Sequence, residues 1–206
     1  FWSRNDGLQN QSVLYTAASP DATPSVLFDP NVLSPDGTIA LGGLAVSDDG
    51  KLMAYALSVA GSDWQEWKVR DIATGKDLPD ILKWAKFTGA SWRKDGSGFY
   101  YSRYPAPAEG QSLKEQNFGQ QIYFHRLGDD QTKDRLVYER PDQKEWFLGA
   151  GVTEDGRWLT VGIHRPSDIH ENLFWYQDLT KKGSKLAPLI DEWGAEYDNL
   201  GNDGTL

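Results

Sequence analysis

Few residues in this chain have the types and the spacing that catalysis requires. The run Gly89-Ala90-Ser91-Trp92-Arg93 comes nearest to the G-x-S-x-G turn that exposes a nucleophilic serine. It lacks the final glycine and lies on a predicted strand. The pair His170-Glu171 is not followed by a second histidine at the metalloprotease spacing. None of the three histidines, which are His125, His164 and His170, has a partner at the spacing of metal ligands. We therefore expect no metal site.

Paired carboxylates are the other candidates for catalysis. Asp48-Asp49 lies in a predicted hairpin turn and Asp129-Asp130 in a polar loop, where aspartates commonly bond their own backbone. Glycoside hydrolysis needs two carboxylates at a set separation, which these pairs alone do not establish. Neither a dinucleotide-binding glycine motif nor a P-loop occurs, so we expect no cofactor. The residues by themselves indicate no catalytic machinery.

Composition excludes several classes of protein. The net charge is −9 and the pI is about 4.8, so the basic surface of a nucleic-acid-binding protein is absent. There are no cysteines, which excludes disulfides and thiolate chemistry. The longest uncharged apolar and glycine run, Ile39–Val46, is too short to span a membrane. No targeting segment is recognisable at the start, and we expect a soluble cytoplasmic or periplasmic protein.

A recurring Asp-Gly turn indicates the β-hairpins that would position any site. It occurs at Asp49-Gly50, Asp95-Gly96, Asp155-Gly156 and Asp203-Gly204, and successive glycines are 46, 60 and 48 residues apart. Asp-Gly between two apolar runs favours a hairpin because glycine readily adopts positive φ. Recurrence at this period is typical of repeats, and four strands per repeat is the size of a propeller blade. The pattern predicts an all-β protein built as a β-propeller.

The order of predicted strands between successive turns indicates about four four-stranded antiparallel blades. The expected units are 1–42 (the end of a first blade and a linker), 43–87, 88–140, 141–192 and 193–206 (the start of a fifth blade). In the second unit, strands are predicted at Gly43–Ser47, Lys51–Leu57, Trp67–Ile72 and Leu82–Phe87. Both ends of the chain interrupt this pattern, so we expect a fragment of a longer propeller. No sustained helical period is present, and little helix is expected.

Several stretches resemble the N-terminal propeller of the prolyl oligopeptidase family. They include 7–15, 27–34, Leu57–Trp64, Asp77–Asp80, Lys86-Phe87, Leu173–Tyr176 and 196–205. The similarity runs in register from end to end. It implies a seven-bladed propeller that covers an α/β-hydrolase domain bearing Ser, Asp and His. The parent would be a serine endopeptidase that hydrolyses short peptides on the carboxyl side of proline. Without that domain, this chain is predicted to be inactive.

The resemblance also implies roles for particular residues. Phe87 matches an aromatic residue that lines the outer substrate pocket; the alternative is a core aromatic at a strand end. Asp63 matches an acid that faces the hydrolase domain and orients a substrate-binding arginine there; the alternative is a turn residue bonding its own loop. A basic position of the family falls at His164 or Arg165, and the sequence does not decide between them. Because strands alternate in direction, Asp63 and Phe87 should lie at the same edge of their blade.

The partners implied are the α/β-hydrolase domain of the same parent chain and short proline-containing peptides. Nucleic acid and membrane are not expected as partners. The alternative that the residues leave open is a stand-alone β-propeller that serves as a protein-interaction scaffold.

Overall fold

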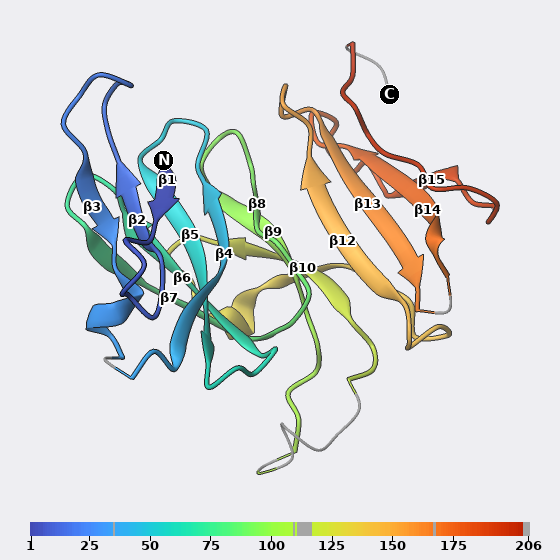
Figure 1. Ribbon diagram of the computed structural model, residues 1–206. Coiled ribbons are helices and arrows are strands. Elements are labelled where there is room, and N and C mark those ends of the chain that lie inside the picture. Colours follow the sequence, from blue (N-terminus) through green and yellow to red (C-terminus); the bar gives the residue numbers. More distant parts are fainter. Residues whose placement is uncertain (35, 109, 111–116, 167, 204–206) are drawn as a thin grey trace.

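The computed structural model describes residues 1–34, 36–108, 110, 117–166 and 168–203, and this part of the chain is built from β-strands (Figure 1). The first sheet contains β1 (Trp2–Arg4), β2 (Val13–Thr16) and β3 (Ser25–Phe28). The second contains β4 (Ile39–Val46), β5 (Leu52–Val59), β6 (Gln65–Asp71) and β7 (Lys76–Ala85). The third contains β8 (Ser91–Trp92), β9 (Gly98–Arg103), β10 (Gln121–Arg126) and β11 (Arg135–Glu139). The fourth contains β12 (Phe147–Val152), β13 (Trp158–Arg165), β14 (Asp168–Asp178) and β15 (Ala187–Ile190).

The strands of each sheet follow one another in chain order, and neighbouring strands are antiparallel. Two single turns of 3₁₀-helix, η1 (Pro30–Val32) and η2 (Gln131–Lys133), lie in connections. The all-β prediction with four-stranded antiparallel sheets is confirmed. Among the described residues, no helix has the length and apolar character needed to cross a membrane.

Three of the Asp-Gly turns occupy the same place in successive sheets, between the first and second strands. The amides of Gly50, Gly96 and Gly156 donate to the carbonyls three residues earlier over 2.9, 3.0 and 2.8 Å, and their φ values are 69°, 68° and 73°. Such φ values favour glycine because it lacks a Cβ. The predicted equivalence of these hairpins is therefore confirmed. The fourth turn includes Gly204, which lies outside the described residues.

The core lies between the faces of neighbouring sheets. Strand β5 shows why: Met53, Tyr55 and Leu57 pack toward the first sheet, while Ala54 and Ala56 pack toward the third. Successive side chains of a strand point to opposite faces, so a strand buried on both faces has a continuous apolar run. A third cluster joins the third and fourth sheets around Ile122, Leu148 and Val161.

Two details differ from the strand predictions. Strand β4 begins at Ile39, earlier than the expected Gly43, because a β-bulge between Leu41 and Gly43 lets the strand continue. Strand β7 ends at Ala85 and not at Phe87, because its pairing with β6 ends where Ala85 lies opposite Gln65. Phe87 lies beyond it with a φ of 51°, outside the extended region. Residues 193–203, where the start of a fifth blade was expected, form no strand. The division of the chain into blades otherwise remains a prediction.

Candidate functional site: the Phe87 rim

Asp63 and Phe87 lie at one edge of the second sheet and line the same hollow. Asp63 follows β5 and Phe87 follows β7, and these two strands run in the same direction on either side of β6. The hollow has a volume of about 410 Å³. It is lined by Gly42, Ser58, Gly61, Ser62, Asp63, Gln65, Phe87 and Thr88. The strand directions thus predict the placement of both residues. We call this edge of the sheets the Phe87 rim.

Phe87 presents its ring to solvent in a backbone conformation that bulky residues rarely adopt. The residue is 62% exposed, and its φ of 51° lies in the left-handed region. Its ring meets the ring of Phe147 edge to face, with 6.1 Å between the centroids. An exposed aromatic ring in a strained backbone is unexpected for a core residue. The core alternative for Phe87 does not fit this position.

Hydrogen bonds anchor both neighbours of Phe87, one through its backbone and the other through its side chain. The Lys86 carbonyl accepts from Gln120 Nε2 over 3.1 Å, and Thr88 Oγ1 accepts from the Ser102 amide over 2.9 Å. Gln120 is 2% exposed, and its Oε1 also accepts from the Leu148 amide over 2.7 Å. One buried glutamine therefore joins the second, third and fourth sheets at the Phe87 rim. The sequence carries no signal for this role, since the contacts span distant segments.

The carboxylate of Asp63 is open to solvent and faces a cation. Its side chain is 62% exposed, and Oδ2 lies 3.9 Å from the ammonium of Lys86. The preceding Ala60 and Gly61 have φ values of 51° and 69° and form the turn that carries Asp63 past the end of β5. The carboxylate is thus available to a further cation. Lys86 was not recognised from the sequence as part of the site.

His164 and Arg165 lie at the end of β13, on the same rim but outside the hollow. His164 is opposite Phe147 in the register of β12 and β13. The guanidinium of Arg165 forms an ion pair with Glu171 and stacks on the Trp193 ring, with 4.4 Å from Cζ to the ring centroid. The structure therefore does not bring either residue against Asp63.

His125 is buried and belongs to a separate cluster. Its Nδ1 lies 2.7 Å from Asp134 Oδ1 and its Nε2 lies 2.9 Å from Asp80 Oδ1. Burial alone disfavours the charged ring, but hydrogen bonds and charges of the two aspartates outweigh it and raise the pKa of His125 to about 9. Both ring nitrogens then carry protons and donate. Among the described residues, no group of three or more potential ligands is placed to hold a metal ion.

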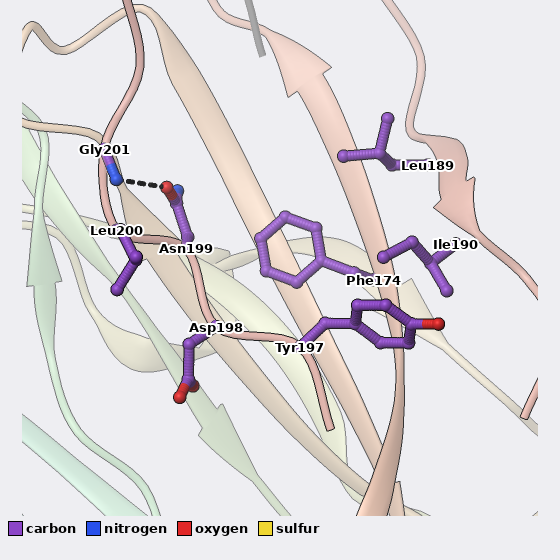
Figure 2. Close-up of a pocket in the computed structure, with 8 residues that line it drawn as sticks. All are labelled: Phe174, Leu189, Ile190, Tyr197, Asp198, Asn199, Leu200 and Gly201. Carbon is purple, nitrogen blue, oxygen red and sulfur yellow. Dashed lines mark hydrogen bonds between the residues drawn. The ribbon is translucent and has the colours of Figure 1, made fainter. Parts of the chain in front are cut away.

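A different hollow lies on the open face of the fourth sheet. It has a volume of about 300 Å³ and is lined by Phe174, Leu189, Ile190, Tyr197, Asp198, Asn199, Leu200 and Gly201 (Figure 2). Its lining is mainly apolar, and the Gly201 amide donates to Asn199 Oδ1 over 2.9 Å. Such a lining suits packing against another apolar surface. The Phe87 rim, with its ring, carboxylate and ammonium, is better suited to binding and orienting a ligand.

Comparisons with known proteins agree on one family. The family model described as prolyl oligopeptidase, N-terminal β-propeller domain, matches residues 1–206. Prolyl oligopeptidase A of Amanita bisporigera is 36% identical over 100% of the chain and 31% of its own length. Prolyl endopeptidase of Elizabethkingia meningoseptica is 36% identical over 99% of the chain and 28% of its own length.

Solved structures give the same result. Prolyl oligopeptidase B from Galerina marginata, bound to a 35mer hydrolysis and macrocyclization substrate, superposes with a TM-score of 0.88 at 32% identity. The superposition covers 98% of this chain and 31% of that one. The chain thus spans less than a third of the length of these relatives.

Proposed function

Because the chain belongs to the prolyl oligopeptidase family, matching its N-terminal β-propeller domain over residues 1–206, we propose that it forms part of a lid over a peptidase active site. The longer enzyme is a serine endopeptidase that hydrolyses short peptides on the carboxyl side of proline. Its catalytic α/β-hydrolase domain is the partner of the propeller. The lid acts as a size filter that excludes large folded proteins from the nucleophile.

The observation that carries this proposal is the exposed ring of Phe87, held rigidly at one rim. A ring that is 62% exposed and whose two neighbours are anchored by hydrogen bonds is suited to packing against an apolar part of a ligand. In the proposed enzyme, the Phe87 rim faces the hydrolase domain. The ring of Phe87 then lines the outer part of the substrate pocket.

Asp63 has a second role in the proposed enzyme. Its exposed carboxylate lines the same hollow and can pair with an arginine from the hydrolase domain. That arginine binds the substrate, and Asp63 holds it in position. A third position that faces the domain interface is His164 or Arg165. Of these, Arg165 is already engaged with Glu171 and Trp193, which favours His164.

The test is a comparison of Phe87→Ala with unchanged protein in the longer enzyme, using proline-containing substrates of increasing length. We expect kcat/KM for longer peptides to fall by an amount that corresponds to a loss of about 1–3 kcal/mol of binding free energy. The shortest substrates should show little change. Trp2→Ala is the matched control, since Trp2 is also exposed and aromatic but lies in the first sheet. An equal loss for all substrate lengths, or none for any, would count against the proposal.

A further inference from the structure

Lys86 is a buried lysine on a rim where Phe87 and Asp63 are exposed. It is 8% exposed, and lysines this buried normally have a partner for their charge. The ammonium lies 3.9 Å from Asp63 Oδ2, 4.5 Å from the centroid of the Trp64 ring and 5.9 Å from that of Phe87. One cation therefore contacts both residues that were assigned to the site, together with the Trp64 ring.

The position of the ammonium is fixed from two directions. The Lys86 carbonyl is held by Gln120, so the main chain from which the side chain departs is anchored across the sheets. The Trp64 ring under the ammonium is itself fixed, because it packs edge to face on Trp84 with 5.7 Å between the centroids. Cation–π contact of this kind is strengthened where the cation is removed from water. Lys86 thus offers a fixed charge to an exposed carboxylate.

Stability alone does not account for this arrangement. Removing an ammonium from water costs free energy. The Trp64 ring offsets part of that cost, whereas a long ion pair to an exposed carboxylate returns little of it. At 3.9 Å, the pair also leaves the Asp63 oxygens free for a second cation. The geometry therefore suits orientation of the carboxylate more than stabilisation of the fold.

We propose that Lys86 is a positioning residue that holds the Asp63 carboxylate and the Phe87 ring in one fixed arrangement. The inference rests on the proposed function, in which Asp63 orients a substrate-binding arginine. Lys86 does not touch the substrate. It sets the direction of the carboxylate before the arginine arrives, so that less ordering is needed when the substrate binds.

The experiment is a double-mutant cycle in the longer enzyme. Lys86→Met removes the charge but keeps an apolar stem against Trp64, and it is measured alone and combined with Asp63→Asn. We expect Lys86→Met to lower kcat/KM about three- to thirty-fold, mainly through KM, and to cause almost no further loss when it is added to Asp63→Asn. Lys86→Arg, which keeps the charge, should restore most of the activity. Lys83→Met is the matched control, because Lys83 is an exposed lysine in β7, the strand that ends just before Lys86.

The outcomes separate this inference from the proposed function. If Asp63→Asn and Phe87→Ala lower activity but Lys86→Met does not, the positioning role is wrong and the proposed function stands. Additive losses from Lys86→Met and Asp63→Asn would also overturn it, because Lys86 would then act independently of Asp63. If Asp63→Asn and Phe87→Ala are both silent, the proposed function fails and the inference fails with it.

Folding is checked on the 206-residue chain itself. A positioning role predicts that Lys86→Met changes the unfolding midpoint by no more than about 5 °C. If the midpoint falls further, Lys86→Gln takes the place of Lys86→Met in the double-mutant cycle. The kinetics of Lys86→Gln then decide between the outcomes above.

Discussion

Asp80 Oδ1 in β7 and His125 Nε2 in β10 lie 2.9 Å apart, and this contact joins the second sheet to the third. Asp80 Oδ1 also accepts from the Gly128 amide over 2.6 Å. On the other side of the ring, the Asp134 carboxylate accepts hydrogen bonds from His125 Nδ1 and from the Tyr101 hydroxyl, the latter over 2.6 Å. A buried imidazolium between two carboxylates is well satisfied as long as it keeps its proton.

The first prediction concerns the dependence of stability on pH. The pKa of His125 is raised from 6.5 to about 9 in the folded chain, so folding favours the protonated ring. The stability that this provides is complete below about pH 6.5 and is lost as the pH rises through about 9. Integrated over that shift, it amounts to about 3 kcal/mol. Urea unfolding of the chain between pH 6 and pH 10 measures the loss.

A matched pair of substitutions isolates His125 as the cause. His125→Asn should abolish most of this alkaline slope and lower stability at pH 6.5 by about 3 kcal/mol, because two buried aspartates lose their cation. His170→Asn changes an exposed histidine and should leave the slope unchanged. A slope that persists in His125→Asn would show that another group titrates.

The second prediction compares two glycines in strands. A Cβ on Gly98 would lie 1.9 Å from the His125 carbonyl oxygen, which is backbone and cannot move aside, whereas a Cβ on Gly149 would meet nothing within 4 Å. Gly98→Ala should therefore cost about 3 kcal/mol of unfolding free energy. Gly149→Ala should be neutral or slightly stabilising, because alanine reduces the freedom of the unfolded chain. Equal effects of the two substitutions would contradict the close approach of β9 and β10.

The sheets were predictable because their signals are local. Asp49-Gly50 and the run Leu52–Leu57 lie side by side in the sequence, so turn and strand could be identified together. The common placement of Asp63 and Phe87 followed from the alternation of strand direction, which needs no side-chain detail.

The remaining features depend on contacts between segments distant in sequence. His125 meets Asp80 and Gln120 meets Lys86 only after neighbouring sheets have packed face to face. No spacing rule connects such residues in advance. The end of β7 at Ala85 was missed for a related reason, since it is set by the pairing of Ala85 with Gln65 on the neighbouring strand, and the type of residue 87 gives no signal for its positive φ.

The third prediction is that the isolated chain does not hydrolyse proline-containing peptides. The hollow at the Phe87 rim is lined by no histidine or cysteine, and its serines therefore have no imidazole base in the lining. Incubation of the purified chain with a chromogenic peptide should show no product above buffer. Cleavage that persists after repurification and is abolished by a substitution within this chain would contradict the assignment of catalysis to another domain.

The fourth prediction concerns Gln120, whose side chain bonds the Lys86 carbonyl and the Leu148 amide at the Phe87 rim. Gln120→Leu keeps the volume but leaves the Lys86 carbonyl and the Leu148 amide without partners, which should lower the unfolding free energy by about 2–4 kcal/mol. Gln121→Leu is the control, since the side chain of Gln121 bonds Glu139 in an exposed position and should matter little. Amide hydrogen exchange supplies the local readout: the Leu148 amide should lose protection in Gln120→Leu and keep it in Gln121→Leu. If Leu148 stays protected in both, Gln120 does not hold the sheets together at this rim.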